Sequence, residues 1–124
     1  AGLPWETRVR RLVRVLCGAE REAQSWFHPD MLALEHQVAE LKHQHRAHEE
    51  LAALWQRVFD ACTDLREPPS PERIKALHLA VWGGRRYALL LRLDEAATSR
   101  WAAEMESLCL SAVRAWQHAD TGMP

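Results

Sequence analysis

The chain has 124 residues, of which 48% are hydrophobic and 27% charged, and its formal net charge is -1. That length suits one domain with its own apolar core, and the composition excludes the low hydrophobicity and high net charge of disordered chains. Near-zero net charge also excludes a general attraction to nucleic acid, which needs a basic excess or a basic face. We therefore expect one folded domain that spans residues 1–124.

The first predicted helix runs from about residue 4 to residue 27. Apolar side chains such as Trp5, Val9 and Leu12 recur on one face at helical spacing, and Pro4 suits the first turn. Arginines occupy the opposite face: Arg8, Arg10, Arg11 and Arg14. Because positive charge near a helix N-terminus opposes the helix dipole, we expect this basic face to bind a partner. An acidic protein is favoured over nucleic acid, and a merely solvated face is the alternative.

His28-Pro29-Asp30 interrupts the pattern, and a second helix is predicted from about residue 30 to residue 65. Its apolar residues alternate at spacings of three and four, which is typical of a seam between helices packed side by side. The first half of this seam consists of Met31, Leu34, Val38, Leu41, His45 and His48. At 1.5 Å per residue the helix is about 54 Å long, so part of it projects beyond its bundle. Because another chain usually covers such a seam, a homodimer interface is predicted there.

Histidines in this second helix have two interpretations. His45 and His48 share one helix face at a spacing that suits metal ligands, and His36 and His43 lie nearby. However, helical metal sites need matching ligands on partner helices, and the other helices do not offer them. We therefore predict no metal. The seam positions of His45 and His48 instead suit control of helix register or a response to pH, or the two histidines are simply tolerated there.

A proline-rich linker precedes the third predicted helix, about residues 71–93, with Ser70 as its N-cap. Gly83 and Gly84 interrupt the helical pattern, which indicates either a bend or another backbone packed closely against it. A fourth helix is expected over residues 95–118, followed by a tail at residues 119–124. Two tryptophans lie beside the apolar stripes of these last helices and are predicted as partner anchors, although such residues often only complete a core. They are Trp82 and Trp116.

Cysteine use and hydropathy bear on the cellular compartment. Cys17, Cys62 and Cys109 are too sparse and too far apart for a disulfide framework, so buried, reduced thiols are expected. No segment has the length and apolar character of a signal peptide or a membrane span. Arginine far outnumbers lysine, a bias typical of GC-rich bacterial genomes. Together these features favour a cytoplasmic bacterial protein that does not enter a membrane.

Four amphipathic helices with short connections predict an all-α fold, a four-helix up-and-down bundle whose extended second helix serves dimerisation or partner binding. The chain has no nucleophile elbow and no phosphate-binding glycine loop, so neither an enzyme nor a cofactor is predicted. By analogy of size and fold class, we expect a small regulator that binds another protein stoichiometrically. An antiactivator or adaptor that sequesters a transcription regulator is the favoured type. The alternatives are a nucleic-acid-binding transcriptional regulator that uses the basic face, and a secretion chaperone or immunity protein.

Overall fold

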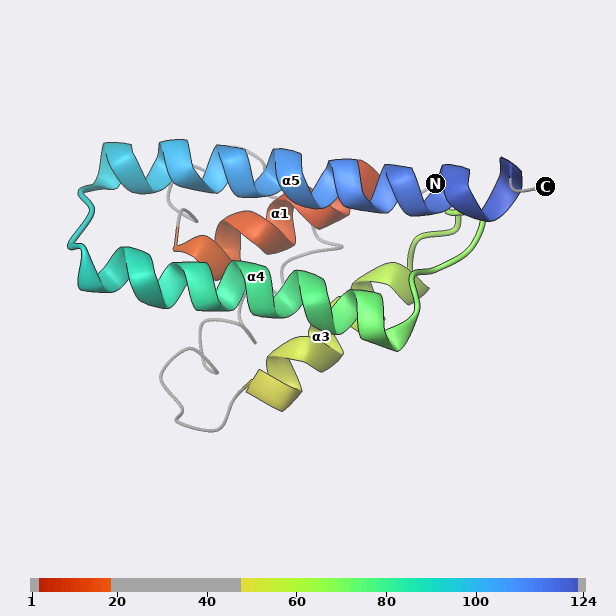
Figure 1. Ribbon diagram of the computed structural model, residues 1–124, viewed down its shortest axis with the longest axis horizontal. Coiled ribbons are helices and arrows are strands. Elements are labelled where there is room, and N and C mark those ends of the chain that lie inside the picture. Colours follow the sequence, from red (N-terminus) through yellow and green to blue (C-terminus); the bar gives the residue numbers. More distant parts are fainter. Residues whose placement is uncertain (1–2, 19–47, 123–124) are drawn as a thin grey trace.

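The computed structural model describes residues 3–18 and 48–122, and this part of the chain contains helices and no strand (Figure 1). The helices are α1 (Trp5–Cys17), α3 (His48–Asp60), α4 (Pro71–Leu90) and α5 (Glu95–Gly122). The expected all-α class is therefore confirmed. Most of the predicted dimer seam lies outside the described residues: Met31, Leu34, Val38, Leu41 and His45. His48 opens α3, and nothing is described of its side chain.

Helix α1 is shorter than the sequence pattern predicts. It starts after Pro4, whose carbonyl oxygen accepts a hydrogen bond from the Arg8 N–H at 3.1 Å. It ends at Gly18, which has a φ of 83° and donates its N–H to the carbonyl oxygens of Arg14 and Val15. A glycine adopts this left-handed conformation without the steric cost that other residues meet, and it is a common helix terminator. The prediction of one helix as far as residue 27 is wrong because apolar spacing alone does not register this stop.

Helix α1 lies at the centre of the described fold. It packs most extensively against α5 and also contacts α4 and α3 (Figure 1). Val9, Leu12 and Leu16 are fully buried on it, and Trp55 and Phe59 of α3 are fully buried as well. The backbone N–H of Trp5 donates a hydrogen bond to Asp64 Oδ2 at 3.0 Å, which connects the start of α1 to the turn after α3. One apolar core therefore joins the first described helix to all the others.

Helix α3 ends at Asp60, so the predicted end of the second helix at residue 65 is wrong, while residues 30–47 lie outside the described range. The Cys62 N–H bonds to the Phe59 carbonyl oxygen at 3.0 Å, a spacing of three residues that closes the last turn. Cys62 and Leu65 nevertheless remain buried. The apolar pattern that suggested a longer helix thus continues through a turn whose side chains still face the core.

Helices α4 and α5 run antiparallel to each other, and α1 packs against both of them (Figure 1). Helix α4 starts at Pro71 as predicted, with Ser70 Oγ accepting a hydrogen bond from the Arg73 N–H at 3.3 Å. It ends at Leu90, three residues before the predicted end, because Arg92 adopts a left-handed φ of 55°. Asp94 Oδ1 then caps α5 by accepting the Ala97 N–H at 2.7 Å. Helix α5 continues to residue 122, beyond the predicted end at 118.

The two central glycines of α4 neither bend nor interrupt the helix. A Cβ placed on Gly84 would lie 2.9 Å from Cζ2 of Trp101 on α5, whereas a Cβ on Gly83 would meet nothing within 4 Å. The element packed against Gly84 is therefore an aromatic side chain, in place of the backbone or bend suggested by the sequence. The absence of a side chain at Gly84 lets the Trp101 ring approach α4 closely.

This difference predicts opposite effects for two neighbouring substitutions. Gly83→Ala should raise the free energy of unfolding by about 1 kcal/mol, because alanine favours the helix and has open space there. Gly84→Ala gains the same helix propensity, but its methyl group must displace the Trp101 ring. We therefore expect the free energy of unfolding to fall by about 1 kcal/mol. Urea unfolding followed by circular dichroism measures both. Equal stabilisation by the two substitutions would show that the Trp101 ring does not pack against Gly84.

Candidate functional site

The arginines of the predicted basic face do not share one surface. Arg11 is buried, with an exposed fraction of 6%, and Arg8 Nε donates a hydrogen bond to the Leu3 carbonyl oxygen at 3.1 Å. Arg10 is exposed, and Arg14 Nε forms an ion pair with Glu106 Oε2 of α5 at 3.0 Å. The idea of one solvated basic face is therefore wrong, because helix α1 is surrounded by other elements. Partner binding by these arginines remains a prediction, which now centres on Arg10 and Arg14.

A groove between α1 and α5 brings Arg10 and Arg14 together with a third arginine, Arg114. Its volume is about 320 Å³. Residues from both helices line it: Arg10, Arg14, Ala103, Glu106, Ser107, Leu110 and Arg114. Sequence reasoning missed Arg114 because an arginine that stands alone among its neighbours in α5 forms no pattern. Only the packing of α5 against α1 places it beside the arginines of α1.

The charges of this basic groove do not cancel. Glu106 is its one acidic lining residue, and its side chain is 8% exposed and held by Arg14. Burial raises the pKa of Glu106 above its ordinary value, while the positive charges of Arg14 and Arg10 act in the opposite direction. Arg114 Nη2 lies 3.9 Å from a Glu6 carboxylate oxygen, and about half of its side chain is exposed. The groove thus keeps exposed positive charge from Arg10 and Arg114 at its rim.

The predicted anchors Trp82 and Trp116 do not line the basic groove. Both are partly buried and pack against the core. The guanidinium of Arg85 lies 4.9 Å from the centre of the Trp82 ring, and that of Arg73 lies 5.0 Å from the Trp116 ring. These are cation–π distances, so each ring already has a cation of its own chain against it. The arrangement favours the alternative in which the two tryptophans complete the core.

Two buried polar groups stand out. Nε and Nη1 of Arg11 are buried and meet no hydrogen-bond acceptor among residues 3–18 and 48–122. The indole N–H of Trp55 is likewise buried without an acceptor in the described part of the chain. Such groups are rare in folded proteins because losing water without a replacement partner costs free energy. Arg11 is therefore a poor candidate for surface recognition, although its sequence neighbours suggest otherwise.

No family model, curated protein or solved structure matches this chain. Within the described ranges no helix is long and apolar enough to cross a membrane, and no three histidine, cysteine or acidic residues come together as metal ligands. The histidine cluster considered as a metal site lies almost wholly outside those ranges, at His36, His43 and His45.

All three cysteines, Cys17, Cys62 and Cys109, are free and buried, as expected. Burial is the main cause that raises the pKa of Cys62 to about 11 and the pKa values of Cys17 and Cys109 to about 12. The Cys62 thiol also lies 3.1 Å from the Val58 carbonyl oxygen, within hydrogen-bond reach. Since the thiolate is the reactive form, none of the three cysteines has the character of a catalytic nucleophile.

Thiol labelling of the native protein should therefore be slow. Compared with a thiol whose pKa is 9.0, the raised pKa values reduce the thiolate fraction at pH 8 about 100-fold for Cys62 and about 1,000-fold for Cys17 and Cys109. Burial also slows access of the reagent to all three thiols. We expect Cys62 to react first, and all three cysteines to react rapidly once urea unfolds the chain. Mass spectrometry after timed exposure to iodoacetamide gives the order. Rapid native labelling of Cys62 would contradict its buried position.

Proposed function

We propose that this protein acts by binding another protein chain stoichiometrically, and that the basic groove accepts an acidic segment of that partner. The observation that carries the proposal is the convergence of Arg10, Arg14 and Arg114 on one groove. Its one acidic lining residue, Glu106, already forms an ion pair with Arg14. Arg10 is exposed, and Arg114 is half exposed with its Glu6 contact at 3.9 Å, so both guanidinium groups can turn toward carboxylates brought by a partner.

The shape and chemistry of the groove favour a peptide segment as the partner group. Arginine presents a planar fork of N–H donors that matches a carboxylate in two parallel hydrogen bonds. Between the arginines, Ala103 and Ser107 are small and exposed, so a backbone can approach α5 closely there. Leu110 is buried beneath the groove, at 2% exposed, so the groove meets a partner mainly through its charged and small residues. Exposed charges at such a rim mainly speed association and select the partner.

The alternative of nucleic-acid binding through the same helix has less support. Affinity for a duplex grows with the number of phosphates that basic side chains neutralise. Arg11 is buried and Arg14 is already paired, so α1 offers fewer phosphate contacts than its sequence suggests.

We propose a bacterial, cytoplasmic regulator of the antiactivator or adaptor type, which sequesters another protein such as a transcription regulator. An up-and-down order of the helices and a homodimer formed through the seam at residues 31–48 belong to the same proposal. In that setting the basic groove serves recognition of the partner, and the seam serves association of two copies.

The test uses a fluorescent 12-residue peptide of alternating glutamate and alanine as a probe of acidic segments. Its binding to the wild-type protein is followed by fluorescence anisotropy at low salt. The double variant Arg10→Glu/Arg114→Glu should weaken binding by at least about tenfold, which corresponds to about 1.4 kcal/mol. The matched control is Arg57→Glu/Arg66→Glu, which makes the same charge change at two exposed positions away from the groove. The control should lose much less affinity.

The outcomes separate the two functions. An equal loss in both double variants would show attraction to overall charge, and would contradict a role for the groove. Tighter binding of a DNA duplex than of the peptide, with a steep loss of affinity as salt rises, would favour the nucleic-acid alternative. No binding of the peptide at low salt would overturn the proposal.

A further inference from the structure

The basic groove lies between two helices, α1 and α5, that run in opposite directions (Figure 1). Arg14 on α1 pairs with Glu106 on α5 at 3.0 Å. Eight residues away on both helices, Glu6 of α1 lies 3.9 Å from Arg114 of α5. A step along α1 therefore corresponds to an equal step back along α5. The α5 lining runs from Ala103 to Arg114, so at 1.5 Å per residue the groove is about 16 Å long, or about three helical turns.

The three arginines of the basic groove follow one another at intervals of one helical turn. Arg14 and Arg10 are four residues apart on α1. Arg114 lies at the level of Glu6, which is four residues further along α1. Four residues of a helix rise about 6 Å, so a positive charge lies about every 6 Å along the groove. Carboxylates four residues apart on one face of a helix have the same spacing, so an acidic helix laid along the groove can meet successive arginines.

The walls of the groove favour a helix over an extended peptide. The lining residues lie inside α1 and α5, where backbone N–H and C=O groups are bonded within each helix. An extended peptide would lose water from its own backbone groups and find few partners on such walls. A docked helix has backbone groups that are already bonded. Extended peptides commonly bind by adding a strand to a sheet edge, and residues 3–18 and 48–122 contain no strand.

Small side chains on α5 leave room for such a helix. Ala103 and Ser107 are exposed, line the groove and stand four residues apart, so they lie on one face of α5. The distance between two packed helices depends on the side chains at their contact, and small residues allow a close approach. A helix that lies close to α5 here holds its side chains within reach of Arg10 and Arg114.

We propose that the acidic segment bound by the basic groove is an α-helix with two carboxylates four residues apart on one face. One carboxylate pairs with Arg10 and the other with Arg114, while Arg14 stays with Glu106. The next turn of the docked helix rests on Ser107. This inference rests on the proposed function and adds to it the conformation of the partner segment.

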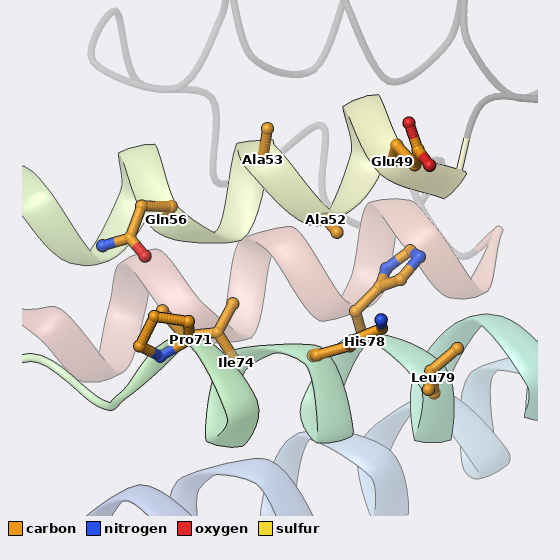
Figure 2. A pocket seen from close by; sticks show the side chains of 9 residues that line it. Glu49, Ala52, Ala53, Gln56, Pro71, Ile74, His78 and Leu79 are labelled. Carbon is orange, nitrogen blue, oxygen red and sulfur yellow. The ribbon is translucent and has the colours of Figure 1, made fainter.

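A second and larger groove, between α3 and α4, lacks this arrangement of charge (Figure 2). Glu49 lines it from α3 and Lys75 from α4, so it holds one charged residue of each sign. His78, which also lines it, is 1% exposed and belongs to the packed interior. Lys75 is exposed, and Lys75→Glu therefore provides a charge reversal in a groove that should not bind the acidic helix.

Three alanine-rich peptides of 16 residues, each with two glutamates, test the conformation of the partner segment. In the first peptide the glutamates stand four residues apart, on one face of a helix. In the second they stand two apart, which places them on opposite faces of a helix but on one face of an extended chain. The third repeats the first with a proline between the glutamates, which breaks the helix. Binding to the full chain is followed by fluorescence anisotropy at low salt.

We expect the first peptide to bind roughly 3- to 10-fold more tightly than the second or the third, because only the first presents both carboxylates from a helix. Arg10→Glu/Arg114→Glu should remove this preference, and Lys75→Glu should keep it. Ser107→Trp should weaken the first peptide at least about threefold by blocking the docked helix. The matched control is Ser111→Trp, at an exposed position of α5 outside the groove lining, which should bind like the wild type.

The outcomes separate this inference from the proposed function. Equal or tighter binding of the second or third peptide, lost in Arg10→Glu/Arg114→Glu, would show that the groove takes an extended segment. The helical conformation would then be wrong, while the proposed function would stand. Equal binding of the first peptide to Ser107→Trp and Ser111→Trp would also overturn the docked helix. If none of the three peptides binds, the inference fails; if the glutamate–alanine peptide does not bind either, the proposed function fails with it.

Discussion

Replacing Trp55 with alanine is expected to lower the free energy of unfolding by about 3 to 5 kcal/mol. Trp55 is fully buried at the centre of α3 and stacks with Phe59, with 6.3 Å between ring centres. Alanine would leave a cavity that the surrounding helices fill only in part. A loss of this size is a large share of the 5 to 15 kcal/mol that stabilises a typical domain. Urea unfolding is therefore best measured at low temperature, where the variant keeps enough folded protein for a baseline.

Trp55→Phe is the matched control, and its effect should be much smaller. It keeps an aromatic ring in the core, and it removes the indole N–H that meets no acceptor in the described part of the chain. Because an unsatisfied buried donor costs about 1–3 kcal/mol, removing it offsets part of the lost packing. We expect the free energy of unfolding of Trp55→Phe to lie within about 1 kcal/mol of the wild-type value. A loss as large as that of Trp55→Ala would show that this N–H does have a partner.

The second large effect concerns the ion pair between α1 and α5. Glu106→Leu should lower the free energy of unfolding by about 3 kcal/mol, because it leaves the Arg14 charge largely buried beside an apolar side chain. Arg14→Met/Glu106→Leu removes both charges and should recover most of that loss, since well-packed apolar residues often replace a buried pair at little cost. Urea unfolding of the wild type and the two variants measures this. No recovery in the double variant would show that Arg14 is not the source of the loss.

The same pair predicts a pH dependence of known sign. Burial raises the pKa of Glu106 above 4.5, so the folded protein holds this proton more tightly than the unfolded chain does. The resulting stabilisation is complete below pH 4.5 and is lost as pH rises through the folded pKa. Glu106→Gln cannot ionise, so the stability of the wild type relative to this variant should fall as pH rises from 4.5 toward neutrality. A relative stability that rises with pH would contradict the raised pKa.

The sequence predicts the helical elements well where local chemistry decides them. Ser70 and Pro71 start α4 as predicted, because a cap depends on a few neighbouring residues. Helix α5 begins at the predicted residue, 95, although its cap, Asp94, was not predicted. Helix ends were less predictable. Gly18 and Arg92 stop their helices through left-handed conformations, while the apolar spacing continues beyond them. Such a spacing reports which side chains face the core, and a turn can present them as well as a helix.

The candidate sites were harder to predict, because they depend on which helices become neighbours. Arg10 and Arg14 were identified from the sequence, but Arg114 joins them only through the packing of α5 against α1. Arg11 belongs to the same run of arginines and is buried, because α1 is enclosed on several sides.

The central position of α1 has a consequence for how the chain folds during synthesis. Its most extensive packing is with α5, which the ribosome makes last among the described helices. At 5 to 20 residues per second, α1 waits about 5 to 20 s before α5 is complete. Throughout that interval the face of α1 that packs against α5 has no cover, although α3 and α4 can already contact the rest of α1. Contacts between segments so far apart in sequence form slowly. Newly made α1 is therefore the segment on which a holding chaperone would act.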